Sequence, residues 1–190
     1  YIYYLKNNNN EAKKYIENIS NLKEDDYFGY NIKGLIYLKN NSYKEARNFF
    51  NIAIKINAKY VDSYNNLGAC LLELEKLDEA KKVFNTAYFI DNKNVSTLIN
   101  LANVLSLEDN ILEAVKYYNE ALNLDPNNHE ILSNLAICYC RDSKEKEAKI
   151  YYDRATKINP YDYKLMYAYC ALQLKLNKFE KSWELFDSRL

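Results

Sequence analysis

The sequence predicts an all-α protein: an α–α superhelix, or solenoid, of about five and a half helix-turn-helix units of 34 residues each. Two observations lead to this fold class. The 190-residue chain contains only three Gly and two Pro, too few turn formers for most β-sandwiches, β-barrels or Gly-rich nucleotide loops. Residues of the same kind also recur at one fixed spacing, which is the signature of a repeat protein.

The repeated positions stand 34 residues apart. Two series are alanines, namely Ala46, Ala80, Ala114 and Ala148, and Ala53, Ala87, Ala121 and Ala155. Between them runs an aromatic series, Phe50, Phe84, Tyr118 and Tyr152. Upstream lie Tyr30, Tyr64, Leu98 and Leu132, followed by the small residues Gly34, Gly68, Ala102 and Ala136. The only prolines are Pro126 and Pro160. This period predicts a partial unit at 1–26, full units at 27–60, 61–94, 95–128 and 129–162, and a degenerate terminal unit at 163–190.

Each unit is expected to hold two helices joined by a tight turn. In residues 61–94, one helical face is formed by Tyr64, Leu67, Gly68 and Leu71. The second helix repeats the pattern at Leu77, Ala80, Phe84 and Ala87. The small residue at Gly68 lets the paired helices approach closely, and the aromatic Phe84 fills the space that the alanines leave.

The two ends of the chain depart from the regular unit. In residues 1–26, the second helix of an earlier unit is indicated by Ala12, Ile16 and Ile19. In the last unit, Cys170 and Ser182 hold small-residue positions, whereas Arg189 replaces the second alanine, so no further ordinary repeat is expected to pack there. Because the chain opens at Tyr1 without Met, we expect it to be a segment of a longer protein.

This order of aromatic or Leu, Leu-Gly or Leu-Ala, Ala, Phe or Tyr, Ala and Pro resembles the tetratricopeptide repeat over nearly the whole chain. The array is similar to bacterial tetratricopeptide arrays and to the repeat arm of protein O-linked N-acetylglucosamine transferase. The resemblance implies a concave face lined by the first helix of each unit, through its second, fifth, sixth, ninth and twelfth residues.

The resemblance places Asn66, Asn100 and Asn134 at the same sixth position of three successive units. A ladder of amides pairs donors with acceptors and suits the backbone of an extended peptide. Hydrogen bonding between helices is the alternative role for these residues in an Asn-rich chain. With three further side chains to set specificity and one more amide, the predicted peptide-binding residues are Asn66, Asn100, Asn103, Asn134, Arg141, Lys164 and Tyr167.

A second device of the family, a clamp for two carboxylates, is not expected here. The best window offers Asn103, Asn134 and Lys164. Ile99 and Ala168 stand where the remaining Lys and Arg are needed, so most of the attraction for an acidic chain end is missing.

Charge and composition exclude several function classes. With 26 basic and 26 acidic residues, the chain is neutral, which argues against nucleic acid or an anionic membrane as partner. His129 is the only histidine and is expected to face solvent at a helix start, and no catalytic constellation or phosphate loop accompanies it. The cysteines have neither disulfide-framework density nor metal-ligand spacing, which favours packing roles in the reducing cytoplasm: Cys70, Cys138, Cys140 and Cys170.

The sequence therefore predicts a non-catalytic scaffold that binds a protein or peptide on its concave face, with no cofactor and no metal. The alternative is a substrate-recruiting arm of a larger enzyme, most plausibly a glycosyltransferase, because the ending 182–189 is similar to that of bacterial arrays followed by such domains. Self-association through the array ends is a third hypothesis.

Overall fold

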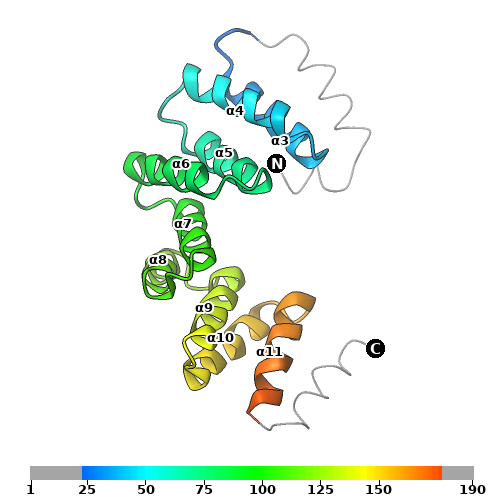
Figure 1. Cartoon of the computed structure of the whole chain (residues 1–190), viewed down its shortest axis with the longest axis vertical. Helices are drawn as coiled ribbons and strands as arrows, with labels where there is room; N and C mark the ends of the chain where they lie inside the picture. The colour runs from blue at the N-terminus through cyan, green and yellow to red at the C-terminus, as the bar shows by residue number, and fades with distance from the viewer. Residues whose placement is uncertain (1–22, 177–190) are drawn as a thin grey trace. The chain divides into compact units, whose positions relative to one another are not determined.

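The computed structural model describes residues 23–176. Every regular element in that range is an α-helix, and no strand occurs there. The chain divides into two compact units, Tyr1–Asn92 and Lys93–Leu190, whose helices are drawn in Figure 1. The partial repeat expected before residue 23, the second helix of the last repeat and its 182–189 ending lie outside the described residues.

The helices of the first unit are α3 (Tyr27–Lys39), α4 (Tyr43–Ile56), α5 (Val61–Glu73) and α6 (Leu77–Ile90). Those of the second unit are α7 (Val95–Leu107), α8 (Ile111–Leu124), α9 (His129–Arg141), α10 (Glu145–Ile158) and α11 (Tyr163–Lys175). Within each unit, consecutive helices pack against one another as hairpins, with the second helix of one pair also contacting the first helix of the next. The all-α repeat prediction is confirmed.

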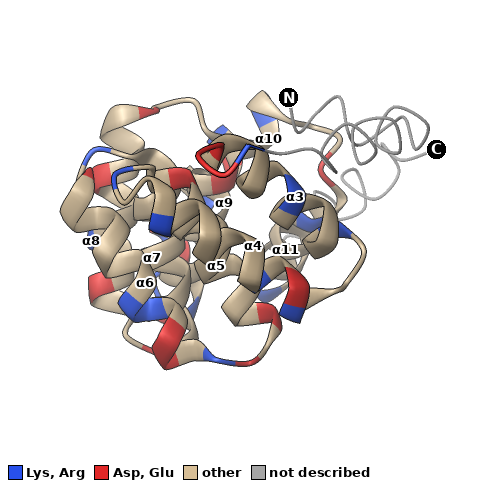
Figure 2. Ribbon diagram, turned by 90° about the horizontal axis from the view of Figure 1, so that it is seen from above, with Lys and Arg blue, Asp and Glu red and all other residues tan. Residues whose placement is uncertain are grey.

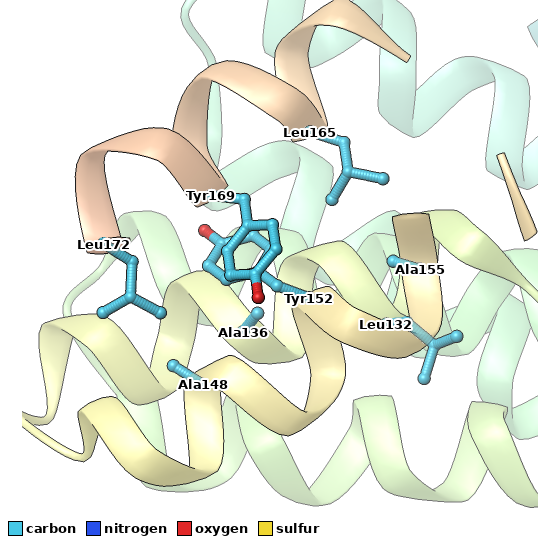
Figure 3. Packing of buried hydrophobic residues seen from close by; sticks show 8 residues of the cluster. All are labelled: Leu132, Ala136, Ala148, Tyr152, Ala155, Leu165, Tyr169 and Leu172. Atoms are coloured by element: carbon cyan, nitrogen blue, oxygen red, sulfur yellow. The ribbon is translucent and has the colours of Figure 1, made fainter. Parts of the chain in front are cut away.

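The core consists of the residues that recur in the sequence. The alanines of both series, Phe50 and Phe84 are 0% exposed, and Tyr118 and Tyr152 are 2% exposed. Figure 3 shows the packing of α9, α10 and α11, where the rings of Tyr152 and Tyr169 stack with centroids 5.3 Å apart. Cys170, which takes the place of Gly in the last repeat, is buried as the sequence predicts.

The glycines permit the close approach expected of them. A Cβ atom placed on Gly68 would lie 2.2 Å from Cε1 of Phe84, and one on Gly34 would lie 2.4 Å from Cε1 of Phe50. Carbon atoms pack at separations of about 3.5–4.0 Å, so neither position has room for a side chain while the ring stays in place.

The helix boundaries follow from local side chains. Four of the five first helices begin with a side-chain oxygen that accepts hydrogen bonds from first-turn N–H groups, supplied by Asp26, Asn94, Asn128 and Asp162. The fifth first helix, α5, has Tyr60 as its N-cap residue, and the Tyr60 side chain makes no such bond. The turns inside the hairpins all use a non-Gly residue with positive φ, between 56° and 62°: Asn41, Glu75, Asp109 and Ser143.

Candidate functional site

Two asparagine amides meet on the first helices of the second unit. Asn134 of α9 donates from Nδ2 to Oδ1 of Asn103 on α7 over 3.3 Å, and the hydroxyl of Tyr118 donates to the same oxygen. Both asparagines are half-buried. An amide group has two N–H donors and an oxygen with two lone pairs, so this bond uses only part of what Asn134 offers.

The first unit contains a related pair. Asn66 of α5 donates from Nδ2 to Oδ1 of Asn31 on α3 over 2.9 Å, and Ser63 donates to the same oxygen over 3.2 Å. Asn66 and Asn134 thus each connect their own repeat to the preceding one. The helix-to-helix role considered for these residues is present, and it takes up one N–H of each.

Asn100 takes no part in the amide pairing described for the second unit. Asn100 is half-buried on α7, and no hydrogen bond joins it to Asn134 within residues 93–176. The resemblance also assigned the fifth residue of each unit to the concave face, and this assignment is wrong for Asn31, Asn65 and Ile99, which are buried. For Asn31, the cause is the following first helix, which covers it with Ser63 and Asn66.

Arg141 at the end of α9 is engaged inside the second unit. Its Nη1 donates to the backbone oxygen of Ser106 over 2.7 Å and to the Ser106 hydroxyl over 2.8 Å. Its Nη2 donates to Oδ1 of Asp109 over 2.7 Å. A planar guanidinium suits such a fork of contacts, and here it fastens α9 to the end of α7 and the turn that follows.

Lys164 and Tyr167 lie exposed on α11. Tyr167 belongs to an apolar stripe along this helix, called here the α11 stripe: Tyr163, Tyr167, Ala171 and Leu174. Tyr163 and Tyr167 are each 71% exposed and Leu174 is 45% exposed. Spacings of four, four and three residues keep these side chains on one helix face.

An exposed apolar side chain also lies on α9. Ile137, one turn after Asn134, is 38% exposed. Lys175, at the end of α11, pairs with Glu145 over 2.6 Å, which leaves Lys164 as the cation beside the first half of the stripe. From this surface the sequence predicts Lys164 and Tyr167 as binding residues. The ninth and twelfth positions of the repeat also assign Ile137, Ala171 and Leu174 to the concave face, although none of the three was named as a binding residue.

The described residues contain no metal site and no paired cysteines. No group of three His, Cys, Asp or Glu within residues 23–176 could hold a metal ion. None of the four cysteines forms a disulfide, and burial raises the pKa of the Cys70 and Cys138 thiols. Such thiols have little thiolate character, which suits packing rather than nucleophilic chemistry.

His129 differs from the solvent-facing residue that the sequence predicts. It begins α9 as expected, but its ring is only partly exposed. Nδ1 lies 3.6 Å from Oδ2 of Asp162, and Nε2 lies 3.5 Å from Nδ2 of Asn159. These neighbours are the C-cap residue of α10 and the N-cap residue of α11, so His129 lies at the connection that leads from one helix pair to the next.

Acidic and basic side chains alternate on the helices. Figure 2 shows Lys and Arg interspersed with Asp and Glu along the described helices of each unit. Several of them pair locally, as Lys76 does with Glu79 and Lys144 with Asp142. Among the helices of residues 23–176, none combines the length and apolar character needed to cross a lipid bilayer.

Comparison with known proteins agrees with this architecture. Three family models, each described as tetratricopeptide repeat, match residues 29–60, 49–82 and 94–160, which together make up more than half of the chain. No curated protein matches the sequence.

Several solved structures share the fold. The structure reported for pilF of Pseudomonas aeruginosa has a TM-score of 0.80 at 21% identity, covering 87% of this chain and 76% of that one. TTC0263 of Thermus thermophilus, a thermophilic tetratricopeptide repeat protein, has a TM-score of 0.77 at 19% identity, covering 91% and 94%. YrrB, described as a repeat protein of this type with an unusual peptide-binding site, has a TM-score of 0.67 at 20% identity, covering 93% and 90%.

At these identities the likeness establishes the fold. Tetratricopeptide repeats are in general non-catalytic modules whose partners are proteins or peptides. The family matches, the helix pairs and the recurring core agree: the chain belongs to the tetratricopeptide repeat family and has the fold of a protein–protein interaction scaffold.

Proposed function

We propose that the second unit binds an extended segment or short helix of a partner protein on the face formed by α9 and α11. The observation that carries the proposal is the α11 stripe, with two tyrosines 71% exposed on a helix whose opposite face is packed into the core. Tyrosine combines a large apolar ring with a hydroxyl and few rotatable bonds, which makes it a frequent anchor at interfaces.

The amides beside this stripe would hold the partner's backbone. Asn134 keeps its carbonyl oxygen for a peptide, because its amide N–H groups serve Oδ1 of Asn103 and the phenol oxygen of Tyr118. Asn100 on α7 adds a second half-buried amide. Asn66 would have the same spare capacity in the first unit. In this binding mode the asparagine amides hydrogen-bond the backbone of the partner, and the α11 stripe contacts its side chains.

The surface favours an apolar partner segment over an acidic one. Lys164 is the cation of the stripe, and Ile99 and Ala168 stand where a two-carboxylate clamp needs basic groups. Arg141, predicted to set specificity, would act indirectly by keeping α9 in position, because its guanidinium already bonds Ser106 and Asp109. The peptide-binding site described for YrrB supports peptide binding as a function that this fold serves.

The test is selection from a random-peptide phage library on the immobilised chain. Selected peptides, made with a fluorescent label, are titrated by anisotropy against the parent chain and the Tyr167→Ala variant. We expect apolar or aromatic residues to be enriched and Tyr167→Ala to weaken binding at least about tenfold, as removal of an interface anchor does.

Phe89→Ala is the matched control, since Phe89 is an exposed aromatic side chain on α6 in the other unit, 90% exposed. Equal loss of binding in both variants, or no enriched peptide, would contradict the proposal. Light scattering over a range of protein concentrations separates a different occupant: a mass that doubles in the parent and stays single in Tyr167→Ala would assign the stripe to a second copy of the chain.

We further propose that this scaffold is non-catalytic and works in the cytoplasm without nucleic acid or membrane as partner. The cysteines, none of which forms a disulfide, and the interspersed charges support these assignments.

A further inference from the structure

The start of α5 departs from the rule that the other first helices follow. α3, α7, α9 and α11 each begin at an Asp or Asn whose side chain accepts first-turn N–H groups. At α5 this position is Tyr60, and no side-chain cap bond is made. A repeat that lacks the stabilising N-cap hydrogen bond of the other repeats is a candidate for a function that the other repeats do not have.

The ring of Tyr60 forms an aromatic corner with the start of α3. It meets the ring of Tyr27 edge to face, with centroids 5.0 Å apart and planes at 62°. It faces the ring of Phe28 at the same angle, with centroids 6.5 Å apart. Phe28 is 48% exposed, so one wall of this corner is open to solvent.

A carboxylate completes the corner. Asp62 lies in the first turn of α5, is exposed and accepts a hydrogen bond from the Tyr60 hydroxyl. Burial, together with this neighbouring carboxylate, raises the pKa of Tyr60 to about 12, so the phenol stays neutral. Phe28 and Asp62 hold the same second position in their repeats, one of those that the resemblance assigns to the concave face.

Aromatic rings around an open edge, with a carboxylate at their side, have the chemistry that recognises a guanidinium group. Its flat face stacks on rings while its edge donates paired hydrogen bonds to a carboxylate. The first unit already uses the attraction of cations for rings once, with Nζ of Lys33 at 4.7 Å from the ring centroid of Phe49.

We propose that the corner formed by Tyr27, Phe28, Tyr60 and Asp62 binds an arginine side chain of a partner protein. The guanidinium stacks against Phe28 and Tyr60 and donates to the Asp62 carboxylate, which has lone pairs beyond the one that takes the Tyr60 hydroxyl. This site lies in the first unit and binds a cation, so the proposal is independent of the one made for the apolar site on α9 and α11.

The test is an NMR titration of the full chain, labelled with carbon-13 in its Phe and Tyr rings, with N-acetyl-arginine N-methylamide. The matched probe is N-acetyl-citrulline N-methylamide, which replaces the guanidinium by a neutral urea of nearly the same shape. The chain has seven Phe, so the Phe28 signal is identified by its loss in Phe28→Leu. We expect saturable shifts of the Phe28 and Tyr60 rings with the arginine probe and none with the citrulline probe.

Two variants measure the walls of the corner. Phe28→Leu and Asp62→Asn each change a side chain outside the buried core, and circular dichroism checks that both variants keep the parent's helix content. Each should raise the dissociation constant of the arginine probe about threefold, and the double variant about tenfold. Tyr161 is the internal control, because it is 81% exposed and next to Asp162 but belongs to the second unit. Equal binding of the citrulline probe, parallel shifts of Tyr161, or unchanged affinity in the variants would each overturn the proposal.

Discussion

Replacing Gly68 by Ala tests whether the ring of Phe84 sets the distance between α5 and α6, the two helices of one repeat. The added Cβ would lie 2.2, 2.5 and 2.7 Å from three ring atoms of Phe84, each more than about 0.8 Å inside ordinary contact. The ring is fully buried between Ala80 and Ala87, which are themselves 0% exposed. It therefore has no free space to move into, and the two helices must separate instead.

Two opposing terms set the size of the effect. Overpacking a filled core costs about 1–3 kcal/mol, and overlap with three ring atoms argues for the upper end. Ala in a helix interior is favoured over Gly by about 1 kcal/mol. We therefore expect Gly68→Ala to lower the free energy of unfolding by about 2 kcal/mol, or to lower the Tm by roughly 4–8 °C for a chain of this size.

The measurement is urea denaturation followed by circular dichroism, with a double-mutant cycle as control. In a Phe84→Leu background the ring edge is gone, so adding Gly68→Ala should become neutral or stabilising by up to about 1 kcal/mol through helix propensity alone. If Gly68→Ala stabilises the parent chain by that same amount, the ring yields freely and the packing argument is wrong.

Three other perturbations have definite expected outcomes. Glu75→Gly should raise the free energy of unfolding by about 0.5–1 kcal/mol in urea denaturation, because Glu75 holds a φ of 57° that disfavours a side chain, whereas Glu75→Ala should leave it nearly unchanged. Arg141→Lys should lower the free energy of unfolding by about 1 kcal/mol and leave the affinity for selected peptides unchanged, because Arg141 bonds Ser106 and Asp109. A change in peptide preference at unchanged stability would instead indicate a direct contact between Arg141 and the peptide. Burial by itself raises the pKa of Asp153, but hydrogen bonds from Lys149 and Tyr169 outweigh this effect and leave the pKa below the ordinary 3.8. The ionised Asp153 therefore stabilises the folded chain fully above pH 3.8, and this stabilisation is lost as the pH falls through the lower pKa of the folded state. The Tm difference between the parent and Asp153→Asn should accordingly be full at neutral pH and shrink in acid, and a difference that does not change with pH would contradict this assignment.

The repeat period made the fold predictable because it reports burial directly. A residue kept at one spacing in successive repeats meets the same neighbours each time, as Ala80 and Phe84 do in their hairpin. Four of the first helices also begin at an Asp or Asn cap that stands at the same place in its repeat. The turn residues carry no such signal, because Glu75 and its counterparts share a backbone conformation and no side-chain type.

The candidate site was predictable only in part, because a surface position depends on what the next repeat brings to it. Asn134 and Asn103 were both predicted as concave-face amides, but the hydrogen bond between them joins positions 31 residues apart, which the 34-residue period does not pair. Arg141 was predicted to set the specificity for a partner, whereas its bonds to Ser106 and Asp109 become visible only in three dimensions. The exposure of Tyr167 followed from position, whereas the fifth-position Asn31 is covered by the following helix.

The positions that break the repeat separate the two units by chemistry. In the first unit Gly68 stands opposite Phe84, whereas in the second Ala102 stands opposite Tyr118, whose hydroxyl reaches Asn103. The Gly–Phe pair brings two helices close and places no polar group between them. In the second unit the Tyr118 hydroxyl and the Asn134 amide both donate to Oδ1 of Asn103, so the phenol is connected to an amide for which peptide binding is proposed. Tyr118→Phe should therefore leave the core filled while freeing Asn103, and its effect should appear in peptide affinity more strongly than in stability. A loss of stability with unchanged peptide affinity would show that this hydroxyl supports the fold alone.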